Sequence, residues 1–171
     1  MPQISRKGTI LPASAIRKLV PYAEAAKAKG IKVYHLNIGQ PDIETPKGAV
    51  DALRKAEMNV VAYTHSAGNI SYRERLCEYY AKHNINITPD EIVVTNGGSE
   101  ALQFAFTICC NQGDEVLIPE PYYTNYNSFA ILSDTVIKTI PSTIDNGFAL
   151  PPIEEFEKAI TPKTRAIMVC N

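Results

Sequence analysis

The sequence lacks any hydrophobic run long enough to cross a membrane and has almost no net charge. Its longest apolar stretches fall far short of the roughly 20 residues that a transmembrane helix needs. Residues 1–7 lead into no apolar segment typical of a signal peptide. The formal net charge is −1 and like charges form no long run, which argues against a nucleic-acid partner bound through a basic face. We therefore expect a cytoplasmic protein that binds small molecules, with no nucleic-acid or membrane partner.

Cysteine and histidine are few, and neither has the spacing of a metal site. The cysteines are Cys77, Cys109, Cys110 and Cys170, and the histidines are His35, His65 and His83. Metal sites require these residue types at short, regular separations, which this sequence does not show. Cys109 and Cys110 also lie in the apolar part of a predicted helix. We expect reduced core cysteines, core or surface histidines, and no bound metal.

The composition is that of a folded globular domain of ordinary size. The 171 residues are 45% hydrophobic and 20% charged, with no internal repeat or low-complexity tract. In the first part of the chain, the patterns predict an arm over 1–13, a helix over 14–29 that Gly30 ends, a strand over 33–38, a helix from Pro46 and a helix over 71–83. Leu76, Tyr79 and Tyr80 are expected on the buried side of the last helix.

The second part of the chain alternates regularly between strand and helix patterns. Strands are predicted at 92–95, 115–119, 135–140 and 164–170, and helices at 99–112, 121–132 and 153–160. This alternation is typical of an α/β fold. Ligands of such sheets bind outside the carboxyl ends of the strands, where residues 97–99 and 121–123 both fall.

A glycine pair follows the predicted strand 92–95 and opens the next helix. Gly97 and Gly98 can adopt positive φ and allow a ligand close to the backbone, while Ser99 can cap the helix and offer a hydroxyl. The unpaired N–H groups and the positive dipole end at a helix start favour a phosphate dianion. Tight strand-Gly-Gly-helix turns also occur without a phosphate, so the residues alone leave both interpretations open.

Several short motifs occur in a fixed order along the chain. They are Gly39-Gln40-Pro41-Asp42, Tyr63 with Ala67-Gly68, Gly97-Gly98-Ser99-Glu100-Ala101-Leu102, Gly113-Asp114-Glu115-Val116 and Pro119-Glu120-Pro121-Tyr122-Tyr123. This ordered set resembles the pyridoxal-phosphate-dependent aminotransferases of fold type I, class I/II, most closely the aspartate aminotransferase branch. The resemblance covers nearly the whole chain from about Leu11, and the order and spacing make it far more specific than any one motif.

The resemblance implies a fold in α/β/α layers that is only partly contained in this chain. Residues 1–45 would be an N-terminal arm and a small-domain segment, and residues 46–171 the first part of the large, mainly parallel-sheet domain that binds the cofactor. Family members run to roughly twice this length. The lysine that forms the Schiff base with the cofactor would lie beyond Asn171. We therefore expect no catalytic residue within the chain and no activity from this portion alone.

The resemblance also assigns cofactor-binding roles. Gly97, Gly98 and Ser99 would hold the phosphate of pyridoxal 5′-phosphate. Tyr123 would stack its ring against the cofactor pyridine, and its alternative is a core tyrosine. Tyr63 would reach across a dimer interface to the phosphate of the neighbouring subunit, and its alternative is a loop aromatic that packs locally.

Three further assignments concern the substrate and the charged residues. Gly39 would lie beside the substrate carboxylate, although from the residues alone it is simply a loop glycine. Glu100 is interpreted as a first-turn residue stabilised by the helix dipole rather than as a catalytic acid. The lysines of the second half are interpreted as solvated surface charges; they include Lys138, Lys158 and Lys163.

The implied activity is the transfer of an amino group between an amino acid and a 2-oxo acid, by a homodimer with shared active sites. Two alternatives stay open, because the residues that would discriminate them lie past position 171. One is a pyridoxal-phosphate-dependent carbon–sulfur lyase or decarboxylase of the same fold. The other is a non-catalytic dimerisation or binding module. Aspartate as the substrate follows from branch similarity alone.

Overall fold

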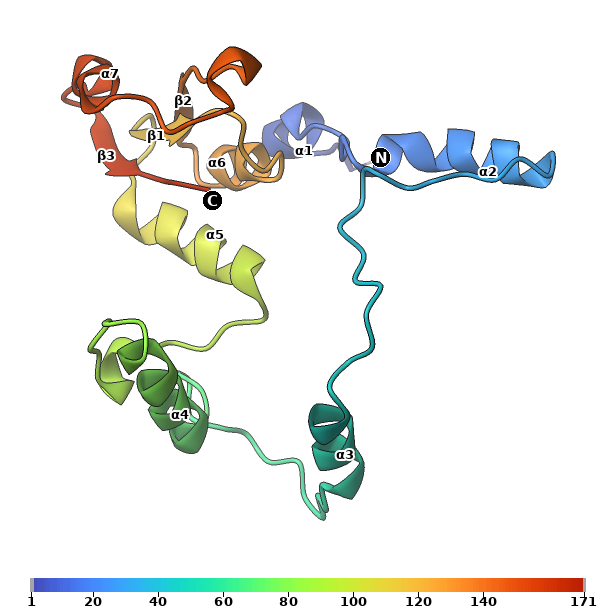
Figure 1. Cartoon of the computed structure of the whole chain (residues 1–171). Coiled ribbons are helices and arrows are strands. Elements are labelled where there is room, and N and C mark those ends of the chain that lie inside the picture. The colour runs from blue at the N-terminus through green and yellow to red at the C-terminus, as the bar shows by residue number, and fades with distance from the viewer. Residues whose placement is uncertain (1, 171) are drawn as a thin grey trace. The chain divides into compact units, whose positions relative to one another are not determined.

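The computed structural model describes residues 2–170, which group into two compact units (Figure 1). The first unit comprises the chain up to Val33 and again from Gly97, and the second is Tyr34–Asn96. Asn171, whose role the resemblance leaves open, lies outside the described residues. The predicted domain boundary at residue 46 concerns the complete fold and stays a prediction.

A parallel three-stranded sheet forms the centre of the first unit (Figure 1). Its strands are β1 (Glu115–Pro119), β2 (Val136–Ile140) and β3 (Thr164–Ile167), in the order β2-β1-β3. β1 pairs with β2 without a break, whereas its register with β3 shifts between Glu115 and Val116. Because the strands are parallel, their carboxyl ends meet at one edge of the sheet, as the predicted α/β class requires.

The first unit also contains helices, and their sequence patterns explain where they begin and end. They are α1 (Arg6–Ile10), the 3₁₀ turn η1 (Arg17–Leu19), α2 (Val20–Ala28), α5 (Gly98–Cys109), α6 (Tyr126–Leu132), the 3₁₀ turn η3 (Ile144–Asn146) and α7 (Ile153–Ala159). Pro21 lies in the first turn of α2, where its missing N–H costs nothing, and Gly30 follows the helix with a φ of 74°. The predicted helical segment 14–29 is thus divided between η1 and α2.

The core has two sides because successive strand residues point to opposite faces of the sheet. Val116 and Ile118 pack with Phe106 of α5 and with Tyr126 and Ala130 of α6. On the other face, Leu117 packs with Ile140 and with Phe156 of α7. Leu117 and Ile118 are completely buried. The expected α/β/α layering is therefore present around β1.

The second unit consists of helices and irregular segments. Its elements are α3 (Lys47–Lys55), α4 (Ile70–Ala81) and the 3₁₀ turn η2 (Pro89–Glu91). Pro46 precedes α3 as predicted, and the side chain of Asn69 caps α4 by accepting a hydrogen bond from the Ser71 N–H. Over the described part of the chain, none of the helices combines the length and the hydropathy that crossing a bilayer would demand.

Two predicted strands, 33–38 and 92–95, are not strands in the structure. A strand exists only where a neighbour completes its ladder, and the three-stranded sheet pairs β1, β2 and β3 alone. The Val94 N–H instead donates to the carbonyl of Ala67, in the loop before α4. The strand pattern of these two segments therefore does not place them in the described sheet.

Other differences concern burial and helix limits. The predicted arm contains the short helix α1, and the helix predicted from residue 121 begins only at Tyr126, because residues 121–125 form turns. Tyr79 is 56% exposed rather than buried, and Arg73 lies in the buried face of α4. All four cysteines are free thiols, as expected. They are not all core residues: Cys109 and Cys170 are exposed, while Cys77 and Cys110 are partly buried.

Candidate functional site

The turn that opens α5 has an open, positively polarised geometry. Gly97 precedes the helix with a φ of 80°, in the region that favours glycine, and the helix begins at Gly98. A Cβ added to either glycine would meet no atom within 4 Å. Gly97, Gly98 and Ser99 are exposed. Since the first N–H groups of a helix have no intrahelical acceptor, this turn can bind an anion through its backbone.

The packing of α5 places this turn towards the carboxyl edge of the sheet. Leu102, Phe106 and Cys110 lie at successive positions on one side of α5 and its end, and they pack against the cluster built on Val116 and Ile118. Only residues 110–114 connect α5 to β1, so the helix runs back along the strand. Its C-terminal end therefore lies near the start of β1 and its N-terminal end near the strand's carboxyl end, where ligands of α/β sheets bind.

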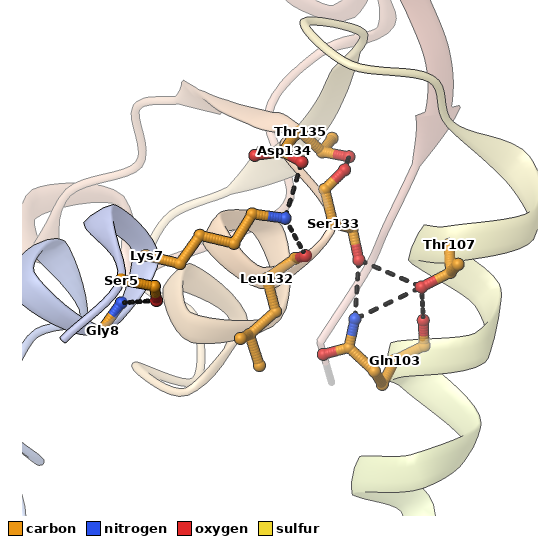
Figure 2. Close-up of polar contacts among 9 residues, drawn as sticks. All are labelled: Ser5, Lys7, Gly8, Gln103, Thr107, Leu132, Ser133, Asp134 and Thr135. Atoms are coloured by element: carbon orange, nitrogen blue, oxygen red, sulfur yellow. Dashed lines mark hydrogen bonds and ion pairs between the residues drawn. The ribbon is translucent and has the colours of Figure 1, made fainter. Parts of the chain in front are cut away.

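A polar network fixes α5 to the turn between α6 and β2 (Figure 2). The Gln103 amide donates to the Ser133 hydroxyl over 2.6 Å, and the Thr107 hydroxyl lies 3.2 Å from the same oxygen. From α1, Lys7 donates to the Leu132 carbonyl at 2.8 Å and pairs with Asp134 at 2.6 Å. These contacts hold α1, α5 and α6 against one another through a single turn.

Tyr123 follows the carboxyl end of β1, as the sequence predicts for an aromatic ring at the site. The residue is 42% exposed, and its ring meets the ring of Tyr126 edge-on, with centroids 5.5 Å apart. Its hydroxyl accepts a hydrogen bond from the Asn125 amide at 2.7 Å. Tyr123 is thus held in place by two neighbours while much of its surface remains accessible, which differs from a core tyrosine.

Two neighbouring tyrosines, Tyr122 and Tyr126, form a cluster of rings with Tyr123. Tyr122 stacks on Tyr126 with an angle of 4° between the rings, and its hydroxyl donates to Asn127 at 3.0 Å. A hydrogen bond with Cys170, together with burial, raises the pKa of the Tyr126 hydroxyl, which therefore stays protonated. This contact joins the chain that follows β3 to α6.

A hollow lies beside these residues at the carboxyl edge. Its volume is about 340 Å³, and its lining comprises Glu120, Pro121, Tyr122, Thr124, Asn127, Ser142 and Phe148. The peptide bond between Glu120 and Pro121 is cis. Within residues 2–170, no group of three or more histidine, cysteine, aspartate or glutamate side chains is arranged to hold a metal ion. The polar side chains in the lining of this hollow are the Glu120 carboxylate, the Asn127 amide and the hydroxyls of Tyr122, Thr124 and Ser142.

Two predicted site residues, Tyr63 and Gly39, belong to the second unit. The Tyr63 side chain is fully exposed. A Cβ at Gly39 would meet no atom within 4 Å, so its surroundings do not themselves require a glycine. The first unit brings Gly97, Gly98, Ser99 and Tyr123 to one sheet edge, whereas the roles assigned to Tyr63 and Gly39 stay predictions.

Asp114, whose pKa is lowered, lies at the start of β1, the opposite end of the strand from the candidate site. Asp114 precedes the strand, accepts a hydrogen bond from the Asn111 N–H at 2.8 Å and pairs with Arg165 at 3.2 Å. These two contacts lower the pKa of Asp114, mainly through the Asn111 hydrogen bond. Asp114 is therefore a structural carboxylate at the start of the strand, away from the candidate site.

The charges singled out in the sequence have mostly structural roles. Glu100 lies in the first turn of α5, where the helix dipole stabilises a carboxylate, as expected. Lys138 is partly buried and donates to the Ala159 carbonyl at 2.9 Å, so it is not the solvated charge that was predicted. It satisfies a carbonyl at the end of α7. Lys158 pairs with Glu155 on the exposed side of the same helix.

Sequence reasoning missed one buried charged residue, Arg73 of α4, which is 5% exposed. Its position gives a usable signal, because Leu76, Cys77 and Tyr80 follow it at intervals of three, four and seven residues. These intervals define one helical face. An arginine on the apolar face of an amphipathic helix predicts a buried guanidinium with a specific acceptor.

Comparison with known proteins finds aminotransferases among the relatives of this chain. Residues 31–171 match the family model described as aminotransferase class I and II. An aspartate aminotransferase of Pinus pinaster is 31% identical over 171 residues, which are 98% of this chain and 35% of that protein. The crystal structure of an aspartate aminotransferase from Thermotoga maritima matches with a TM-score of 0.86 at 32% identity, over 96% of this chain and 44% of that one.

An alanine aminotransferase from Pyrococcus furiosus gives a TM-score of 0.84 at 30% identity, over 96% of this chain and 43% of that one. The chain therefore spans 35% to 44% of the length of these relatives. This share agrees with the partial length that the sequence predicts.

Proposed function

The chain belongs to the aminotransferases of class I and II, and on this premise we propose that the protein it forms part of transfers an amino group between an amino acid and a 2-oxo acid, with pyridoxal 5′-phosphate as cofactor. The observation that carries the proposal is the family match over residues 31–171 combined with the open glycine turn at the start of α5. Aminotransferase relatives with different named substrates match almost equally well. We therefore propose the reaction class and no single substrate.

The residues at the carboxyl edge fit the cofactor. The backbone amides at the start of α5, with the Ser99 hydroxyl, offer donors to a phosphate, and the space around the Cα atoms of Gly97 and Gly98 is open. Bound pyridoxal phosphate supplies an electron sink for negative charge that develops at the substrate Cα. Tyr123 offers a flat π surface whose orientation is fixed by Asn125 and Tyr126.

The remaining assignments extend the proposal to the assembled enzyme. We propose that Tyr63 binds the phosphate held by the neighbouring subunit of a homodimer, and that Gly39 lies beside the substrate carboxylate. Both follow from the family resemblance, and the full exposure of the Tyr63 side chain supports the first. The cytoplasmic location expected from the sequence stays a prediction.

The test uses the protein encoded by the complete gene. We expect it to bind pyridoxal phosphate and to convert an amino acid to its 2-oxo acid only when a second 2-oxo acid accepts the amino group. Release of carbon dioxide or of a thiol without an acceptor would favour the decarboxylase or lyase alternative. Absence of cofactor binding would favour a non-catalytic module.

Borohydride reduction followed by peptide mapping locates the lysine bonded to the cofactor. We expect a single stoichiometrically labelled lysine outside residues 1–171. A stoichiometric label on Lys138 or on any other lysine of this chain would contradict the proposed division of the active site.

Gly97→Val tests the phosphate-binding turn in the same protein. A β-branched side chain disfavours positive φ and intrudes on the anion, so hydrogen bonds to the charged phosphate are lost and we expect cofactor affinity to fall by about tenfold or more, whereas Gly48→Ala should leave it unchanged. Gly48 is a suitable control because its surroundings are equally open and it lies within α3. Equal cofactor affinity in both variants would show that this turn does not bind the cofactor.

A further inference from the structure

Two adjacent tyrosines that follow β1 are each paired with an asparagine, but the two hydrogen bonds run in opposite directions. The Tyr122 hydroxyl donates to the side-chain oxygen of Asn127 at 3.0 Å. The Tyr123 hydroxyl accepts from the side-chain amide of Asn125 at 2.7 Å. Asn127 also donates from its amide nitrogen to the Thr124 carbonyl at 3.3 Å, which fixes the orientation of its side chain. All five residues belong to the first unit.

The pair of Tyr122 and Asn127 is structural. Tyr122 is partly buried, and its ring stacks on the ring of Tyr126. Tyr126 is 9% exposed and packs in the core cluster with Val116 and Ile118. Since a half-buried hydroxyl needs a partner in the protein, Asn127 supplies the acceptor that this packing requires.

Tyr123 has less packing to hold it, because the residue is 42% exposed. Its ring meets the edge of the Tyr126 ring, which is itself fixed in the core. A single edge contact sets where the two rings meet but leaves the outer ring free to tilt. The hydrogen bond from Asn125 holds the opposite end of the Tyr123 ring, at its hydroxyl. The two contacts together therefore fix the plane of this ring.

Asn125 does not make the contact that is usual for an asparagine at its position. It is the N-cap residue of α6, where an asparagine side chain commonly accepts a hydrogen bond from a backbone N–H of the first turn. Its side chain makes no such bond, and its φ of −70° and ψ of −15° are helical rather than extended. The amide is directed to the partly exposed Tyr123 hydroxyl instead, a contact that contributes little to stability.

We infer that Asn125 is a positioning residue of the cofactor site, an inference that rests on the proposed function. Tyr123 is proposed to stack on the pyridine ring of the cofactor, and stacking depends on the tilt of the ring. A ring that is held before binding loses less conformational freedom when the ligand arrives. Stacking itself needs no hydroxyl, since phenylalanine presents the same surface. The hydroxyl of Tyr123 serves as the acceptor through which Asn125 holds the ring.

The first test compares asparagine variants of the complete protein. Asn125→Ala should bind pyridoxal phosphate about three- to tenfold more weakly, because ordering of the Tyr123 ring then opposes binding. Its cofactor-free form should unfold at the temperature of the unaltered protein, since no cap bond is lost. Asn127→Ala should show the reverse, with a lower unfolding temperature and a smaller change in affinity.

Asn111→Ala is the control for cofactor affinity. Asn111 is exposed and contacts Asp114 at the opposite end of β1, so this variant should bind the cofactor as the unaltered protein does. Equal affinities of Asn125→Ala and Asn111→Ala would overturn the inference. It would also be overturned if Asn125→Ala lost as much stability as Asn127→Ala, because Asn125 would then be a structural residue.

The second test is a double-mutant cycle with Tyr123→Phe, which keeps the ring and removes the acceptor for Asn125. Circular dichroism of the bound cofactor reports the geometry of the ring beside it. We expect Asn125→Ala and Tyr123→Phe to change this signal and the affinity in the same way, with no further change in the double variant. Losses of affinity that add would show that Asn125 acts elsewhere, and they would contradict the inference.

Failure of the proposed function gives a different result, since the unaltered protein would then bind no pyridoxal phosphate. If the unaltered protein binds the cofactor and Asn125→Ala matches Asn111→Ala in affinity and in circular dichroism, only the present inference is wrong.

Discussion

The two units of the chain bury their apolar residues to very different extents. In the first unit, β1 contributes completely buried residues to clusters on both faces of the sheet. In the second unit, all of whose residues the structure describes, only Arg73 and Ile92 are buried. Large apolar side chains of the second unit, such as Leu36 and Val61, are almost fully exposed.

The two units therefore differ in the interactions that stabilise them. The first unit is stabilised by apolar burial around a parallel sheet, which is the dominant favourable contribution to folding. The second unit relies on a few directional contacts, among them the Arg73–Pro89 and Val94–Ala67 hydrogen bonds. Regions with few buried apolar contacts open at low free-energy cost. Extensive exposed apolar surface also marks faces that other protein surfaces cover, and we expect such contact to stabilise the second unit.

The largest effect should come from Leu117→Ala. Leu117 is completely buried between Ile140 and Phe156, so its truncation loses transfer free energy and leaves a cavity. We expect the free energy of unfolding to fall by about 2–5 kcal/mol in denaturant titration. Leu53→Ala in the second unit removes the same atoms from an exposed position and should change stability by less than about 0.5 kcal/mol. Similar losses for both variants would break the distinction between the units.

A glycine pair provides the next comparison. Gly97→Ala places a side chain at a φ of 80° and should destabilise the protein by about 1–2 kcal/mol. Gly48→Ala lies within α3 and should stabilise it by about 0.5–1 kcal/mol, because alanine loses less backbone entropy in a helix. Thermal unfolding of both variants checks the signs. A stabilising Gly97→Ala would contradict the left-handed conformation at the turn.

The pH dependence of stability should reveal the contribution of Asp114 in the first unit. Because the folded state lowers the pKa of Asp114, this carboxylate contributes stability above its unfolded pKa of about 4. The contribution is lost as the pH falls through the lower folded pKa. Asp114→Asn should therefore lose stability at neutral pH and show a flatter acid response. Asp51→Asn, at an exposed position of α3, is the control. If both variants showed the same acid response, the Asn111 and Arg165 contacts would not be the cause of the pH dependence.

The smallest effect is expected for the contact that ties α1 to the first unit. Lys7→Met removes the ion pair with Asp134 and the hydrogen bond to the Leu132 carbonyl. Both charged side chains are about half exposed, so the loss should be about 0–1 kcal/mol and smaller at high salt. Unfolding titrations at low and high salt measure it, with Lys27→Met of α2 as the control. A loss above about 2 kcal/mol would show that α1 belongs to the core.

Local sequence patterns were sufficient to predict some elements and turns of the first unit. The alternation around β1 predicted its residues 115–119 as the structure has them. The glycine pair predicted the turn that opens α5, and Gly97 adopts the positive φ that the residue type allows. The order of the motifs also predicted the family, which the match over residues 31–171 confirms.

Tertiary structure alone decided which extended segments became strands and which side chains were buried. Residues 33–38 and 92–95 have strand patterns, yet no partner in the described sheet completes their ladders. Whether Arg73 is buried, or Cys109 exposed, depends on surfaces that come from distant parts of the chain. Propensity and periodicity report the preferences of a segment, whereas pairing and burial require a second segment at the right place. The sequence by itself thus determined the local geometry of the glycine turn at Gly97, whereas tertiary contacts decided that Arg73 is buried and that Val94 packs on Gly68, because those contacts need a second segment.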